Sequence, residues 1–384
     1  MMYRQFAKAS ILLLAVIAAA WSALTFPHAA TSNSVLFDRE IVRILNIHCA
    51  MCHMNEGITE DITTWQQTWL KRDAIQEQVL ARHMPPWAAV SGYGSFINAN
   101  QLTLREKRFI VSWVEGLGPR NAGEVFFNVP GEDGTQDEPV IASFDTSTWR
   151  LGEPDRLVRI APDNFEAGSF EDSEMLKTIL IIDPLIQEET FLTGLEFLPD
   201  DRSNLHAVVF RVAGSEQWLS TWTPWYGYRG LPEGSGFRLV PGQQIQADYL
   251  LSDDNSGMSV EGNLGLHFAS TTPIRQVQEI SIETQGRDKR LQAATTLKSD
   301  STITALWPEL PAGTHSLEVS ARTPGGHVNI LLLALDIQEQ WPTSYILELP
   351  ITLPAGSRLT VTANAGDAQT AELSGMLRLT LSTY

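Results

Sequence analysis

The chain has 384 residues, of which 43% are hydrophobic and 19% are charged, so its composition is that of a globular protein and excludes global disorder. At about 150 residues per domain, this length predicts two or three folding units. The formal net charge of −18 disfavours binding to nucleic acid and to anionic bilayers, because both would repel it. We therefore expect no nucleic-acid partner.

The first segment has the pattern of an export signal. Arg4 and Lys8 precede an apolar run over residues 11–26. A membrane-spanning helix needs about 20 apolar residues, so this shorter run favours a signal peptide over residues 1–30, with an N-terminal anchor as the alternative. We expect export to the periplasm or cell envelope of a bacterium, and no further membrane span.

Helical periodicity marks the next segment. Apolar residues recur at helical spacing over residues 37–45, 65–80 and 104–117, and Thr103 is placed to cap the third of these helices. We expect an all-α domain over residues 32–119.

The two cysteines of the chain lie within this helical segment, as Cys49-Ala50-Met51-Cys52, and His53 follows directly. A c-type haem needs two thiols for its thioether bonds and a histidine just beyond them whose imidazole reaches the iron. A thioredoxin-like pair would require a βαβ context, and a zinc site would require further ligands. A disulfide across so short a loop would stabilise little. The pattern therefore predicts one covalent haem c.

The second axial ligand of the iron must come from elsewhere in the chain. Met84 precedes two prolines and Trp87, which fix an extended segment, and a thioether there would raise the reduction potential. His83 is the alternative ligand, and an open coordination position is a third. Met51 and Met54 are too close to the attachment segment to reach the opposite haem face.

Beyond residue 119 the composition changes. Residues 120–145 gather Gly, Asp, Glu and Pro and predict a linker. Short β-branched or alternating runs then follow, separated by turn residues, and they predict antiparallel sandwiches over residues 146–290 and 291–384. The clearest runs are residues 178–182, 207–212, 245–251, 264–268, 317–319, 345–349 and 359–362.

Taken together, Cys49 to His53, the Met84-Pro85-Pro86-Trp87 segment and the closing helix over residues 104–114 resemble the cytochrome c module of certain bacterial secreted proteins. In that family the module precedes a region similar to the copper type II, ascorbate-dependent monooxygenases of the peptidylglycine α-hydroxylating group. The resemblance implies a multidomain fold in which an all-α cytochrome c-like domain is followed by two antiparallel β-sandwiches.

The same resemblance implies two copper sites, most of whose ligands are missing here. Of the first site only His206 remains, because Asp248 and Leu250 stand at the other positions. The second site retains His327 and Met376, which are the residual copper candidates, although a surface imidazole and a core thioether explain them equally well. We therefore expect no copper. His206 and His267 are interpreted as ordinary strand histidines.

An aromatic run consists of Trp218, Trp222, Trp225, Tyr226 and Tyr228. It could line a groove or shield an interdomain face, and packing around a loop is the simpler interpretation.

The sequence favours a non-enzymatic electron carrier with one haem, whose β region docks a partner or organises an assembly. One alternative is a haem-fed copper monooxygenase, which the missing ligands disfavour. The other is a redox subunit of a larger complex. The redox protein partner is not identified by any motif.

Overall fold

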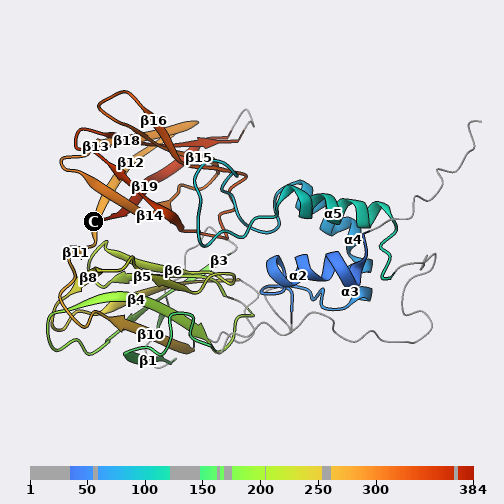
Figure 1. Ribbon diagram of the computed structural model, residues 1–384, viewed down its shortest axis with the longest axis horizontal. Helices are drawn as coiled ribbons and strands as arrows, with labels where there is room; N and C mark the ends of the chain where they lie inside the picture. Colours follow the sequence, from blue (N-terminus) through green and yellow to red (C-terminus); the bar gives the residue numbers. More distant parts are fainter. Residues whose placement is uncertain are drawn as a thin grey trace, which may run out of the picture.

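The computed structural model describes residues 35–54, 59–121, 148–161, 165–167, 175–203, 205–252, 261–366 and 371–384. The predicted export signal lies outside these ranges, as does the predicted linker from residue 122 onward. Helices lie on one side of the molecule, and two stacks of sheets lie on the other (Figure 1).

Five helical elements occur in the described residues before residue 121, at the places where the periodicity predicted helices. The long helix predicted over residues 65–80 is divided at Lys71, whose backbone leaves the helical region with φ −102° and ψ 5°. The elements are η1 (Phe37–Ile41), α2 (Val42–His48), α3 (Trp65–Leu70), α4 (Arg72–Leu80) and α5 (Leu104–Glu115).

Helix α5 begins with a capping box. The Thr103 hydroxyl accepts from the Glu106 amide at 3.2 Å, and the Glu106 carboxylate accepts from the Thr103 amide at 2.7 Å. These two bonds satisfy amide groups that the helix itself leaves without partners. The cap predicted at Thr103 is confirmed.

The helical unit is closed by the turn that follows α5. The indole nitrogens of Trp65, Trp69 and Trp113 donate to backbone carbonyls of residues 117–119, each at 3.0 Å. Phe37 of η1 packs against Trp113, with ring centroids 5.9 Å apart. The first helical segment, α3 and α5 are therefore joined through one small core.

The first sandwich contains two sheets that enclose an apolar core. One sheet has the strand order β1-β10-β4-β8-β11, with β7 paired to β4, and the other has the order β2-β3-β9-β5-β6. All pairs are antiparallel except the short β8–β11 pair. The strands are β1 (Arg156–Ile160), β2 (Phe165–Ala167), β3 (Met175–Ile182), β4 (Thr190–Pro199), β5 (Leu205–Val212), β6 (Trp218–Trp222), β7 (Tyr228–Gly230), β8 (Ser235–Leu239), β9 (Ile245–Ser252), β10 (Gly262–Phe268) and β11 (Arg275–Gln276).

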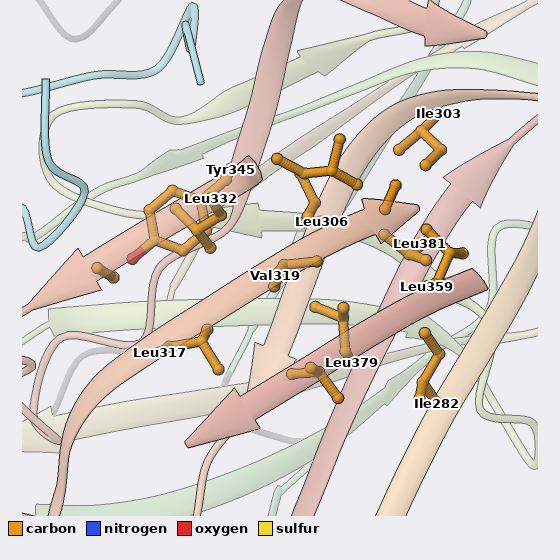
Figure 2. Packing of buried hydrophobic residues seen from close by; sticks show 14 of the residues in the cluster. Ile282, Ile303, Leu306, Leu317, Val319, Leu332, Tyr345, Leu359, Leu379 and Leu381 are labelled. Carbon is orange, nitrogen blue, oxygen red and sulfur yellow. The ribbon is translucent and has the colours of Figure 1, made fainter. Parts of the chain in front are cut away.

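The second sandwich pairs the sheet β12-β19-β14-β17 with the sheet β13-β18-β15-β16. Leu306 and Leu379 from the first of these sheets, and Val319 and Leu359 from the second, fill the space between them (Figure 2). The strands are β12 (Gln278–Asp288), β13 (Arg290–Thr296), β14 (Ser301–Glu309), β15 (Thr314–Arg322), β16 (Val328–Leu335), β17 (Tyr345–Leu353), β18 (Arg358–Ala365) and β19 (Leu373–Thr383). The predicted β character of this half of the chain is confirmed.

The division between the sandwiches differs from the one predicted at residue 290. β12 pairs with β19 along its whole length, from Gln278 to Asp288. Strand pairing therefore assigns β12 to the second sandwich, which begins near residue 278. Because β11 of the first sandwich ends at Gln276 and β12 begins at Gln278, only one residue separates the sandwiches, and no linker composition marks this boundary.

The segment after α4 extends from the helical unit onto the second sandwich (Figure 1). Ala89 and Phe96 form isolated bridges with Ala334 and Leu347, and Trp87 belongs to the core of the second sandwich. Trp87 and Phe96 both pack against Tyr345, at centroid distances of 5.3 Å. Residues 84–98 thus tie the helical unit to the carboxy-terminal sandwich.

Candidate functional site: the Cys49 to His53 turn

Cys49, Cys52 and His53 lie in one turn at the carboxyl end of α2. The Cys49 amide donates to the Leu45 carbonyl at 2.9 Å, so the first cysteine closes the helix. The amides of Cys52 and His53 both donate to the Cys49 carbonyl at 3.1 Å. The turn therefore brings the three predicted site residues together.

The imidazole of His53 is oriented by the backbone. Its Nδ1 lies 2.9 Å from the Glu60 carbonyl oxygen. A carbonyl oxygen only accepts, so Nδ1 carries the proton and Nε2 keeps its lone pair. Burial lowers the pKa of His53, which also favours the neutral ring. A neutral imidazole whose other nitrogen is hydrogen-bonded to a carbonyl is the form in which histidine binds metals.

Neither thiol is in a disulfide. Burial raises the pKa of Cys49 to about 12, and burial raises the pKa of Cys52 to about 12 although the positive charge of Arg202 opposes the rise. A thioredoxin-like cysteine needs the opposite shift, because its thiolate is the nucleophile. The environment of the pair does not favour dithiol redox chemistry.

A second set of contacts fixes the start of the turn. His48 Nδ1 lies 2.9 Å from the Asn100 side-chain oxygen, and His48 Nε2 lies 3.5 Å from the Glu106 carboxylate. Asn100 is buried and Glu106 is in the first turn of α5. The cysteine turn is therefore held against the amino-terminal end of α5.

The first sandwich faces this turn across a cavity of about 360 Å³. His48 and Met51 line it from the helical side, and Trp222, Trp225 and Tyr226 line it from the sandwich side. Tyr228 lines the cavity as well, so four of the five residues in the aromatic run border it. The fifth, Trp218, packs between the sandwiches against Trp307.

Arg202 connects the sandwich to the second cysteine. Its guanidinium lies 5.3 Å from the centroid of the Trp222 ring, donates to the Pro224 carbonyl and acts electrostatically on Cys52. Burial lowers the pKa of Arg202 to about 10. Nothing in the local sequence pointed to Arg202, because it meets the turn only through the tertiary fold.

The two predicted distal ligands differ in exposure. Met84 is half-buried and lines a cavity of about 230 Å³ together with Trp87 of its own segment and Lys107 of α5. His83 is exposed, its Nδ1 lies 3.2 Å from the Gln78 side-chain oxygen, and its carbonyl accepts from Gln338 at 2.6 Å. The methionine is thus the one of the pair that borders an internal space.

The positions of the missing copper ligands have separate surroundings. His206, Asp248 and Leu250 line a cavity of about 900 Å³ between the sandwiches. His327 lies in the exposed turn before β16, and Met376 lies in β19 of the other sheet with 46% of its surface exposed. Within the ranges that the structure describes, no group of three or more His, Cys, Asp or Glu side chains could hold a metal ion.

His206 itself is engaged by protein groups. It occupies a bulge in β5, its Nδ1 lies 3.2 Å from the Gln340 carbonyl, and its ring stacks on Trp341 at 4.3 Å. Burial lowers the pKa of His206. The other strand histidine, His267, lies in β10.

Among the helices of the described residues, none is long and apolar enough to cross a membrane.

Comparison with known proteins gives no family for this chain. No protein-family model matches it, and no curated protein matches it. Among solved structures, PNGF-II in space group P21 aligns with a TM-score of 0.29 and 9% identity, over 59% of this chain and 65% of that one, which is less than two thirds of its length. The CBM22-1-CBM22-2 tandem domain of Paenibacillus barcinonensis Xyn10C aligns with a TM-score of 0.18 and 10% identity, over 62% of this chain and 98% of that one. These scores are too low to support any argument about this protein.

Proposed function

We propose that this protein is an exported c-type cytochrome that transfers single electrons through one covalently attached haem. Cys49 and Cys52 would form the thioethers, and His53 would be the proximal ligand of the iron. The observation that carries the proposal is the orientation of His53, whose Nδ1 proton is bonded to the Glu60 carbonyl while two unpaired thiols stand in the same turn.

The donor set fits the group. Two thiols outside any disulfide can each form one thioether bond, and a neutral imidazole can offer Nε2 to iron. The haem, when bound, supplies one-electron exchange between ferric and ferrous iron. Met84 would be the distal ligand, with His83 as the alternative.

The chain's own residues would hold the group and shield it. The contacts of His48 with Asn100 and Glu106 fix the attachment turn against α5, and burial of Cys52 and Ala50 excludes water from its inner side. Arg202 would place a positive charge next to the second thioether. A buried positive charge there disfavours loss of an electron from the iron, so Arg202 would raise the reduction potential.

The two sandwiches would dock a redox partner or organise an assembly. The supporting observation is that the first sandwich lines the cavity beside the attachment turn with aromatic side chains and two arginines, Arg150 and Arg202, residue types that are enriched at protein interfaces. The haem-fed copper monooxygenase is not our proposal, because Asp248 and Leu250 stand where the resemblance implies imidazole ligands. The remaining candidates are also separated, since His327 lies in the turn before β16 and Met376 lies in β19 of the other sheet.

An optical redox titration tests the function. The protein is produced with a periplasmic signal in a bacterium that has haem-attachment machinery, and the ferrous haem band is followed against potential. We expect one reversible one-electron transition. The Cys49→Ala/Cys52→Ala double variant is the control and should show none. Absence of any haem band from the wild-type protein would end the proposal, and stoichiometric copper with oxygen consumption would favour the monooxygenase instead.

A further inference from the structure

The cavity beside Met84 is lined by positive charge. Arg82 and Lys107 border it, and none of the described residues that line it is an aspartate or a glutamate. The chain has 45 acidic and only 27 basic residues, so a wall with two cations and no carboxylate runs against its overall charge. Because such a wall attracts negative charge, its occupant should be an anion.

The protein matches these two charges only in part. Arg82 Nε lies 3.6 Å from the Asp336 carboxylate, and the two terminal nitrogens of Arg82 have no acceptor in the part of the chain that the structure describes. The half-buried ammonium of Lys107 has no acceptor there either. Burial and the positive charge of Arg82 both lower the pKa of Lys107. Two like charges that act on each other in this way are stabilised by an anion that contacts both.

Arg82 occupies a backbone position that favours glycine. It follows Ala81, the last residue of the cap of α4, and its φ of 63° lies in the left-handed region. Helices commonly place glycine at this position, because a Cβ is disfavoured there. The side chain of Arg82 is therefore retained at some loss of stability, which favours a functional role for its guanidinium.

The size of the cavity limits the occupant to a small group. Its volume of about 230 Å³ is below the range of about 300 to 1,000 Å³ for ligand-sized pockets, so it can take a carboxylate but not a whole porphyrin. Haem carries two propionate carboxylates on one edge, and Met84, the proposed distal ligand, lines the same cavity. Given the proposed function, on which this step rests, we propose that Arg82 and Lys107 bind a propionate of the haem through charge-assisted hydrogen bonds.

Redox titration of the haem-loaded protein measures the effect of each charge. Loss of a cation leaves the propionate's negative charge unmatched near the iron, which favours ferric iron, so Lys107→Met and Arg82→Gly should each lower the reduction potential. We expect roughly a tenfold change in the equilibrium constant of reduction, which is about 59 mV for one electron. Arg108→Met is the matched control, because Arg108 is the next residue of α5, is exposed and does not line the cavity. Its exposed charge is screened, so the constant should change by less than about twofold.

A second readout separates this role of Arg82 from a purely structural one. Glycine suits the left-handed backbone, so Arg82→Gly should leave the midpoint of chemical denaturation unchanged or raise it. The measurement uses the haem-free Cys49→Ala/Cys52→Ala protein, with and without Arg82→Gly. A lowered midpoint would assign Arg82 to the stability of the fold and would overturn the proposal for this residue.

The ferrous haem band distinguishes a failure of the propionate contacts from a failure of the proposed function. A wild-type protein without haem would end both. A haem-loaded protein whose potential is the same in wild type, Lys107→Met and Arg82→Gly would overturn only the propionate contacts.

Inorganic phosphate tests whether a free anion fills the cavity instead. At constant ionic strength, phosphate should leave the potential of the wild-type protein unchanged, because the propionate already occupies the two cations. A phosphate-dependent shift that disappears in both Lys107→Met and Arg82→Gly would identify a free anion as the occupant and would contradict the proposal.

Discussion

His53 shows how much a single backbone contact decides at the scale of one residue. The Glu60 carbonyl fixes both the tautomer and the direction of the His53 imidazole. Glu60 lies seven residues beyond His53, and the sequence did not predict this contact. The residue types and spacing of Cys49, Cys52 and His53 predicted the candidate site. Arg202 could not be predicted, because its approach to Cys52 depends on the packing of a β-sandwich against a helical turn.

The distal ligand can be tested at the same scale. Met84→Ala should abolish the weak sulfur-to-iron band at the red end of the ferric spectrum and lower the reduction potential, because a thioether favours ferrous iron. His83→Ala is the matched control, since its side chain is exposed, and it should leave the band in place. A band that persists in Met84→Ala would exclude Met84 as the ligand, and a wild-type protein without the band whose low-spin spectrum is lost in His83→Ala would assign the ligand to His83.

Among the secondary-structure elements, those with local signals were predictable. The capping residues of α5 stand three positions apart, and β5, β9 and β18 each contain a β-branched or alternating run that predicts a strand. Residues 84–98 carry no such pattern, and their partners lie more than 200 residues away in β16 and β17. The sequence therefore did not predict that residues 84–98 join two domains.

The capping box of α5 gives a prediction about one element. Thr103→Ala removes the acceptor for the Glu106 amide and should lower the free energy of unfolding of the helical unit by about 1 kcal/mol. Chemical denaturation followed by helical circular dichroism measures the change. Thr296→Ala, at an exposed position in β13, should alter stability by less than about 0.5 kcal/mol. Equal effects of the two variants would argue against the cap.

Asn98 is the buried link between residues 84–98 and β17. Its side-chain nitrogen donates to the Ser344 carbonyl at 2.7 Å, and its oxygen accepts from the Ile346 amide at 3.0 Å. Asn98→Ala leaves both backbone groups buried without this partner, so we expect a loss of about 2 to 4 kcal/mol in thermal or chemical denaturation. Asn98→Asp retains only the acceptor, so its loss of stability should lie between those of the wild-type protein and Asn98→Ala. A loss below about 0.5 kcal/mol in Asn98→Ala would contradict this role.

For the whole molecule, Arg229 joins the two sandwiches. It lies in β7, is 2% exposed, and donates at 2.7 Å both to the Leu219 carbonyl and to the Ser382 hydroxyl of β19. Its guanidinium also lies 4.0 Å from the centroid of the Trp218 ring. Burial lowers its pKa to about 9, and the negative charge of Glu279 opposes this change. The interface between the sandwiches therefore contains a buried charge that needs its partners.

The loss of stability caused by replacing Arg229 should therefore depend on pH. Burial raises the pKa of Glu279 from 4.5 to about 7, so between these values the folded protein holds a proton that the unfolded chain releases, and this group's contribution to stability falls as pH rises. Removing Arg229 raises that pKa further. We expect Arg229→Met to lower the free energy of unfolding by about 3 kcal/mol, and by more at about pH 8.5 than at about pH 5.5.

Tryptophan emission during denaturation at the two pH values provides the measurement. Arg287→Met is the control, because Arg287 pairs with Glu372 on the exposed surface and its loss should matter little at either pH. A loss for Arg229→Met that is the same at both pH values would show that Glu279 does not respond to Arg229.

The arrangement of the domains was the least predictable level of structure. Composition and periodicity divided the chain into a helical part and a β part, but the boundary near residue 278 and the cavity between the sandwiches follow from long-range strand pairing. Local patterns carry no information about which strands pair across such distances.

The central claim is that haem is bonded to the chain at the turn after α2. Peptide mass mapping of protein matured in a haem-attaching periplasm, after acid-acetone extraction of any free haem, tests it most directly. We predict that the mass of the peptide containing Cys49 and Cys52 is increased by the mass of one haem. The same peptide at its unmodified mass, from cells that mature a control cytochrome normally, would contradict the account.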